Sequence, residues 1–165
     1  MKKYLLLMLL AFVVAGGYAQ KGRQAVGVQT GIMGFVDYEA GGGAELLYQY
    51  SFADAWRVET ALGGYGGEDV FMVGNTSELQ FLIGKRRIRP MIFAGFNLGY
   101  GEFHDYYNYT EDYCESGFIF GGFGGIGFDC RLSYSWSLMG KFFVGGATTI
   151  EDAYFGGKVG VTYNF

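Results

Sequence analysis

Three residues near the middle of the chain carry the side chains that acyl transfer needs. Glu102, His104 and Ser116 supply a carboxylate, a base and a hydroxyl group. In covalent hydrolysis, a serine nucleophile is activated by a histidine that a carboxylate orients. A simple hairpin with Tyr100 opposite Phe120 would set His104 opposite Ser116 on the outward face. These three residues are therefore the candidates for a catalytic site, if the protein has one.

A glycine-rich stretch, Gly122 to Gly127, matches the G-x-G-x-x-G pattern of dinucleotide-binding loops. It lies inside an alternating apolar segment and does not precede a helix, so the context that dinucleotide binding requires is missing. Glycines in such a segment allow a sheet to curve and large neighbours to pack. The acidic residues show no EF-hand-like spacing. We therefore predict no cofactor and no metal.

Two cysteines, Cys114 and Cys130, raise the question of a disulfide. In an exported chain a disulfide is the default expectation. However, residues 118–130 would rise about 40 Å along one strand. A disulfide needs Cα atoms within about 7 Å of each other. We therefore predict that the two cysteines do not pair.

The first residues have the three parts of a secretory signal peptide. Lys2 and Lys3 are basic, residues 4–15 form a short apolar run, and Gly17 and Ala19 stand at the cleavage positions. About a dozen apolar residues are too few to span a bilayer as a helix. We expect a cleaved signal peptide of residues 1–19, followed by one domain of residues 20–165.

The composition is unusual for a water-soluble domain. The chain has 30 Gly, 16 Phe and 14 Tyr, and 50% of its residues are hydrophobic. After the signal peptide these residues are spread over short segments, with no uncharged apolar run of about 18 residues. The formal charge is −4, and losing Lys2 and Lys3 makes it −4 − 2 = −6. A nucleic-acid partner is therefore not expected.

The segments that would position the candidate residues alternate between apolar and polar side chains. Alternation with a period of two predicts strands that have one apolar face. Eight such segments follow the signal peptide, the first of them near Gln24 to Phe35. The apolar faces run from Val26 to Ile32, Leu46 to Phe52, Trp56 to Leu62, Leu79 to Ile83, Ile92 to Tyr100, Phe118 to Phe128, Trp136 to Val144 and Phe155 to Phe165.

The connections between these segments alternate in length. Tight turns are expected at residues 52–55, 85–90 and 132–135, and longer loops at 36–42, 66–75, 102–117 and 148–153. An even number of strands with short periplasmic turns and longer extracellular loops is typical of a transmembrane β-barrel. A soluble, lipocalin-like barrel is the alternative. Its outer face would need more charges and fewer glycines than the polar faces of these segments provide.

The whole mature chain resembles the small eight-stranded outer-membrane barrels of Gram-negative bacteria, the OmpA/OmpX-like, porin-like class. The most specific element is the last strand, because Val161, Tyr163 and Phe165 resemble the C-terminal signal that the barrel-assembly machinery reads. The resemblance implies an all-β, antiparallel, up-and-down transmembrane barrel. It also implies a monomer in the outer membrane, surrounded by lipid and lipopolysaccharide.

The polar face of these strands carries charges of both signs. In an eight-stranded barrel this face fills an interior that is only wide enough for side chains. Buried charges are costly unless they are paired. We therefore predict an interior ion-pair network, not a general pore, formed by Glu45, Glu59, Glu78 and Asp129 with Arg57, Arg131, Lys141 and Lys158.

The expected loops are acidic and contain no Lys or Arg, and the third of them is rich in tyrosine at residues 106–109. Such loops could bind an extracellular partner or divalent cations bridging lipopolysaccharide phosphates, or could be solvated loops and an aromatic belt. The basic residues Lys85, Arg86, Arg87 and Arg89 crowd one short turn instead.

We predict a non-enzymatic protein with a structural or adhesin-like surface role. A narrow gated channel is a further alternative, and a lipid A deacylase-like enzyme is another, because such enzymes occur among small outer-membrane barrels. The His-x-Ser pattern of those deacylases is absent, since Tyr106 stands at the serine position.

Overall fold

The computed structural model describes residues 23–36, 40–68, 70–105, 113–147 and 152–165. The predicted signal peptide lies outside the described residues, as do the tips of several expected loops. Within the described part of the chain, no helix is long and apolar enough to cross a membrane.

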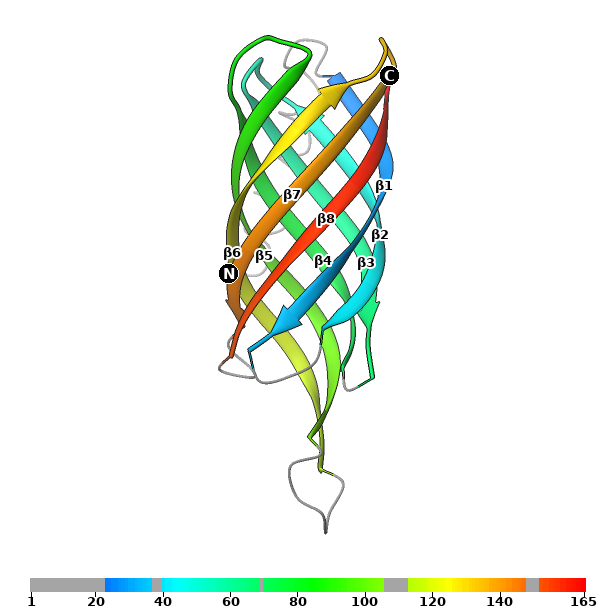
Figure 1. The fold of residues 1–165 in the computed structure, drawn as a ribbon, viewed down its shortest axis with the longest axis vertical. Coiled ribbons are helices and arrows are strands. Elements are labelled where there is room, and N and C mark those ends of the chain that lie inside the picture. Colours follow the sequence, from blue (N-terminus) through cyan, green and yellow to red (C-terminus); the bar gives the residue numbers. More distant parts are fainter. Residues whose placement is uncertain (1–22, 37–39, 69, 106–112, 148–151) are drawn as a thin grey trace, which may run out of the picture.

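Eight strands form one closed antiparallel sheet, in which each strand pairs with its neighbours in sequence and β1 pairs with β8 (Figure 1). The predicted all-β, up-and-down barrel is confirmed. The strands are β1 (Arg23–Phe35), β2 (Gly41–Ser51), β3 (Trp56–Gly66), β4 (Val70–Leu82), β5 (Ile88–Asp105), β6 (Tyr113–Arg131), β7 (Trp136–Ala147) and β8 (Asp152–Asn164).

The outer face of the barrel is apolar, because most residues that point away from the interior are apolar. Leu46, Leu62, Ile126 and Phe142 are all more than half exposed. Water would not tolerate so continuous an apolar surface, whereas lipid requires it. The exposed aromatic pair Trp136 and Tyr163, with ring centroids 5.2 Å apart, lies near one end, as interfacial aromatics do. A lipocalin-like arrangement with this face turned inward is therefore excluded.

The two ends of the barrel differ in shape. The tight turns and the C-terminus lie at the upper end in Figure 1, and the β5–β6 hairpin extends beyond the other strands at the lower end. Pairing between β5 and β6 continues to Asp105 opposite Tyr113, whereas β4 reaches only Phe103 of β5. In barrels of this kind the short turns face the periplasm, so the hairpin projects on the extracellular side.

Two expected loops contain more strand than predicted. β4 begins at Val70, so most of the expected loop 66–75 is paired with β3. The alternation was hidden there because the inward residues Val70 and Met72 are as apolar as the outward residue Phe71. Likewise, strand pairing takes up much of residues 102–117.

A small polar cluster lies on the outer face, where the sequence predicted a largely apolar strand face that includes Thr60, and a loop that includes Asn75. The Asn75 side-chain amide donates to Thr60 Oγ1 (3.0 Å) and to the Ala61 carbonyl (3.1 Å), and Ser77 Oγ donates to Asn75 Oδ1 (3.1 Å). Thr60 and Ser77 are also linked, with 3.2 Å between their hydroxyl oxygens. Because each polar group has a partner within the cluster, it meets the requirement that lipid-facing polar groups be satisfied internally.

Candidate functional site

The middle of the barrel interior holds a buried lysine between two carboxylates. Lys141 Nζ lies 2.5 Å from Glu59 Oε1 and 2.6 Å from Glu78 Oε1. All three side chains are nearly inaccessible to solvent. Gln49 and Gln80 donate to Glu59 Oε2 at 2.7 and 3.0 Å, so the negative charge gains further hydrogen bonds. Such satisfaction is what makes buried charges tolerable.

A second ion pair lies closer to the hairpin end. Lys158 Nζ is 2.8 Å from Glu45 Oε2, which also accepts a hydrogen bond from Gln29 Nε2 (2.6 Å). The ammonium group stands over the rings of Tyr65 and Phe143, 5.4 and 5.1 Å from their centroids. Cation–π contact of this kind compensates part of the lost hydration. Lys158 is therefore held by one carboxylate and two aromatic faces.

The third cluster lies near the turn end and differs from the prediction in one residue. Asp129 pairs with Arg89 at 2.5 Å and with Arg57 at 3.5 Å, and Arg57 Nε also donates to Gln80 Oε1 (2.5 Å). Arg131, which was expected in this network, is exposed. Arg131 is the last residue of β6, at the turn end of the barrel, and its side chain is not enclosed.

The interior charges balance among the described residues. Four carboxylates face four cations, because Arg89 takes the place predicted for Arg131. The residues are Glu45, Glu59, Glu78 and Asp129 with Arg57, Arg89, Lys141 and Lys158.

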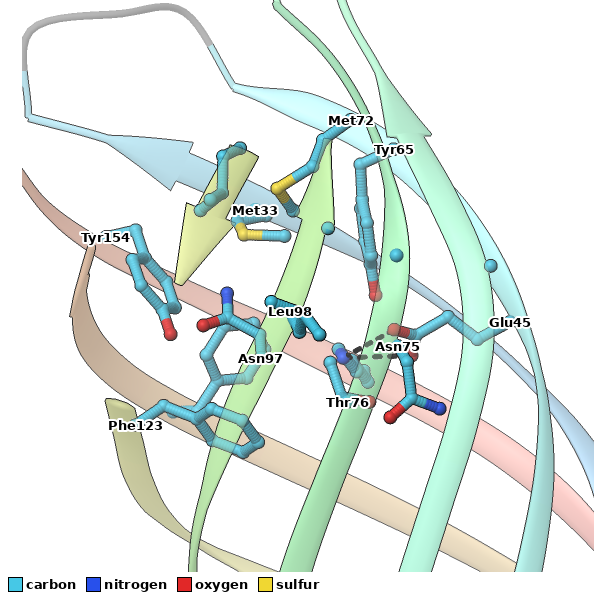
Figure 2. Close-up of a pocket in the computed structure, with 16 residues that line it drawn as sticks. Met33, Glu45, Tyr65, Met72, Asn75, Thr76, Asn97, Leu98, Phe123 and Tyr154 are labelled. Atoms are coloured by element: carbon cyan, nitrogen blue, oxygen red, sulfur yellow. Dashed lines mark hydrogen bonds and ion pairs between the residues drawn. The ribbon is translucent and has the colours of Figure 1, made fainter. Parts of the chain in front are cut away.

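Apolar side chains fill the interior at the hairpin end, which the sequence reading did not anticipate. Met33, Tyr65, Met72, Ile119 and Tyr154 are buried and belong to one cluster. A signal was present in the sequence, because apolar residues occupy both faces of the strands near this end. Residues of this apolar cluster and the Lys158–Glu45 pair line the same pocket, so the cluster lies next to the ion pair (Figure 2).

The cavity that remains inside is small. Its volume is about 30 Å³, and its lining includes Glu45, Tyr65, Asn97 and Lys158 (Figure 2). Among the described residues, Asn97 Oδ1 has no hydrogen-bond partner although it is buried. The volume suits a water molecule, which would satisfy that oxygen, and is far too small for a sugar or an acyl chain.

The structure changes the register assumed for the catalytic candidates. Tyr100 pairs with Phe118, Glu102 pairs with Ser116, and His104 pairs with Cys114. The predicted juxtaposition of His104 and Ser116 was therefore wrong by two positions. Such a shift keeps every side chain on its own face, so the alternation could not reveal it. The side chain of His104 lies outside the described residues.

The remaining motifs behave as ordinary strand residues. Gly122 to Gly127 lies within β6 and opens no helix. Cys130 is a free thiol that pairs in register with Ile88, at the end of β6 opposite to Cys114. Across the described ranges, no three His, Cys, Asp or Glu side chains are grouped so that they could hold a metal ion.

The rims of the barrel carry opposite charges. Glu68, Glu102, Asp105 and Asp152 lie at or near the hairpin end. At the turn end, the exposed charged residues of the described chain are Arg23, Asp54, Lys85, Arg86, Arg87 and Arg131. The side chains of Asp105 and Asp152, like those of the remaining acidic residues of the expected loops, lie outside the described part of the chain.

These features define a small transmembrane β-barrel of the outer-membrane type. The sheet is closed with eight strands, its outer face is apolar and its interior is filled with paired charges.

The comparisons with known proteins agree at the level of the fold. The N-terminal β-barrel domain of OprF from Pseudomonas aeruginosa is 13% identical over 88% of this chain and 100% of that chain, with a TM-score of 0.62. The attachment invasion locus protein Ail of Yersinia pestis is 14% identical over 88% and 100%, with a TM-score of 0.59. The outer membrane protein OprG of P. aeruginosa is 14% identical over 87% and 96%, with a TM-score of 0.54.

No protein-family model matches the chain. No curated protein sequence matches it either. The structural similarity confirms the predicted outer-membrane barrel class, and identities this low show the fold alone.

Proposed function

We propose that the protein is a non-enzymatic outer-membrane barrel that acts at the cell surface, in an adhesin-like or structural role, through its acidic hairpin end. The observation that carries this proposal is the β5–β6 hairpin, which extends beyond the other strands and bears Glu102 and Asp105. The interior is filled by ion pairs and apolar side chains, so the rim is the surface left for contacts. One protein of similar fold is described as an attachment invasion locus protein, which is consistent with such a role.

Assembly and surroundings follow from the same proposal. Tyr163 and Phe165 are exposed on the outer face, and the Phe165 amide donates to the Gln24 carbonyl (3.0 Å). A paired strand end with outward aromatics supports a role for Val161, Tyr163 and Phe165 as the signal read by the barrel-assembly machinery. In this proposal the barrel is monomeric and is surrounded by outer-membrane lipid and lipopolysaccharide.

Cell attachment tests the surface role. We would compare cells that lack the protein, cells that carry it, and cells with Glu68→Gln, Glu102→Gln, Asp105→Asn and Asp152→Asn combined. Attachment to polylysine-coated glass should rise with the wild-type protein. It should fall to the level of the deletion strain in the combined variant, because the acidic charge is gone. Added salt should weaken the wild-type effect, since exposed charges are screened beyond roughly 10 Å at 0.1 M.

The matched control alters charge at the opposite rim. Lys85→Gln with Arg86→Gln should leave attachment unchanged, because these residues lie at the turn end. If cells with and without the protein attach equally, the surface role is wrong. Leakage of a periplasmic enzyme would then test the structural role. More leakage from the deletion strain than from the wild type would support that role, and equal leakage would reject the structural role as well.

The lipid A deacylase alternative has its own test. The register places Ser116 opposite Glu102, so the structure gives no added support to a His104–Ser116 pair. We expect identical mass spectra of lipid A from cells with and without the protein. An acyl chain that is missing in the presence of the wild-type protein and restored by His104→Ala would show a hydrolase and overturn the non-enzymatic proposal.

A further inference from the structure

A cluster of exposed basic side chains occupies the turn end of the barrel. Arg86, Arg87 and Arg131 are exposed, and the Lys85 side chain is 90% exposed. One carboxylate, Asp54, lies 3.9 Å from Lys85, but it is itself 94% exposed. Pairs of this kind contribute little. The proposed surface role at the other rim gives this cluster no function.

Two adjacent turns hold the cluster together. Gly84 has a φ of 84°, a conformation that favours glycine, and it reverses the chain so that the basic residues follow at the tip. Arg87 Nε donates to the Arg131 carbonyl (2.8 Å), and Arg87 Nη2 donates to the Leu132 carbonyl (3.2 Å). The Arg131 amide donates back to the Arg87 carbonyl (2.9 Å). These contacts join the β4–β5 turn to the β6–β7 turn and fix the orientation of one guanidinium group.

Arg87 keeps donors available beyond these contacts. A guanidinium group has five N–H donors in a planar fork, and two of them are used within the turn pair. The fork matches the oxygens of a phosphate better than a lysine ammonium does. The neighbouring Lys85 and Arg86 add charge without such a fixed position. The cluster therefore combines one oriented donor group with several adaptable ones.

Apolar neighbours set the depth of the cluster in the membrane. Ile83, Ile88 and Leu132 flank the two turns and are each about half exposed, and Tyr134 is 97% exposed. Apolar side chains in this position contact acyl chains, whereas tyrosine lies at the level of the lipid headgroups. The basic groups next to them are consequently placed where phosphates lie.

We propose that Lys85, Arg86, Arg87 and Arg131 bind the phosphate of an anionic phospholipid headgroup in the periplasmic leaflet. The positive rim complements the negative headgroup, and exposed Ile88 and Leu132 contact the acyl chains of the same lipid. This site does not depend on the surface role proposed above. It fixes the turn end of the barrel against the inner face of the bilayer.

Native mass spectrometry of the purified full barrel, released from micelles that contain either phosphatidylglycerol or phosphatidylcholine, tests the proposal. The wild-type protein should retain phosphatidylglycerol preferentially. Arg86→Gln should weaken retention roughly fivefold and Lys85→Gln with Arg86→Gln roughly 25-fold, since each basic residue near an anionic surface contributes about a factor of five. Both variants leave the hydrogen bonds of Arg87 intact. A difference in gel mobility before and after boiling would verify that each variant is folded.

The matched control is Arg23→Gln. Arg23 is exposed at the same rim but begins β1, which lies across the closed sheet from β5. Its loss should change retention far less than the loss of Arg86. Equal losses would mean that only the overall charge of the rim matters, and would overturn a localised site.

Three other results would also contradict the proposal. The first is equal retention of the two lipids by the wild-type protein. The second is displacement of phosphatidylglycerol by inorganic phosphate but not by sulfate at equal ionic strength, which would identify free phosphate as the ligand. The third is retention on purified peptidoglycan that is lost in the double variant while lipid retention is unchanged.

Discussion

Replacing Lys141 by methionine should lower the free energy of unfolding by about 3–5 kcal/mol, because it removes one partner of a buried ion pair. Glu59 and Glu78 lie 2.5 and 2.6 Å from the ammonium group and are almost fully buried. Without the lysine, two carboxylates would share a space from which water is excluded. Urea unfolding of the barrel in lipid vesicles, followed by the fluorescence of Trp56 and Trp136, would measure the loss.

Two further variants show whether the loss comes from unpaired charge. Lys141→Met combined with Glu59→Gln and Glu78→Gln should recover most of the stability, since no ion is then left without a partner. In vesicles of phosphatidylcholine, which offer the turn no anionic headgroup, Lys85→Met removes a lysine whose pair with Asp54 is exposed, and it should leave the urea midpoint unchanged. A Lys141→Met barrel that unfolds within about 1 kcal/mol of the wild type would contradict the prediction, because it would mean that water reaches the carboxylates.

Gly63→Ala should destabilise the barrel by about 1–3 kcal/mol, because the interior has no room for a methyl group at this position. Gly63 faces inward on β3 and pairs with Glu45 of β2. A Cβ atom there would overlap the Ala44 carbonyl oxygen and would lie 2.6 Å from Glu45 Cα and 2.7 Å from Glu45 Cγ. Backbone atoms of a paired strand cannot move aside without disturbing the ladder. The displaced Glu45 would also lose its position beside Lys158.

Gly66→Ala is the matched control on the same strand. A Cβ atom at Gly66 would meet nothing within 4 Å. This change should therefore be neutral, or stabilise the barrel by up to about 1 kcal/mol, because alanine lowers the conformational entropy of the unfolded chain. The same urea experiment compares the two variants. If both alanines have equal effects, strand propensity and not the space beside Glu45 determines the outcome at Gly63.

The strand faces could be predicted from the sequence because lipid imposes a simple rule on this barrel. Most outward residues of β7 and β8 are apolar and most inward residues are polar or small, with Met139, Phe143 and Tyr154 as the inward exceptions, so the alternation is clear in these strands. At the hairpin end of β4 the rule gives no contrast. Val70 and Met72 point into the barrel and Phe71 points out, yet all three are apolar. The start of β4 was therefore missed.

The alternation of apolar and polar residues could predict neither the register between strands nor which residues near a strand end are enclosed. Shifting β5 against β6 by two residues exchanges the partners of Ser116 while each side chain keeps its face. Arg89 and Arg131 both occupy inward positions close to a strand end. Arg89 pairs in register with Asp129 and is enclosed, whereas Arg131 comes after the last enclosed position of β6. The register of β5 against β6, which the sequence does not display, places Arg89 and not Arg131 beside Asp129.

The pairing of β1 with β8 has a consequence for how long the folded protein lasts. Every strand of the closed sheet is bonded to two neighbours, so none can detach without breaking two ladders at once. The transition state for opening must therefore lose many hydrogen bonds before any strand gains freedom. We expect amide protons in the middle of the strands to exchange together and slowly. The persistence of the barrel would then be governed by an unfolding rate more than by an equilibrium free energy.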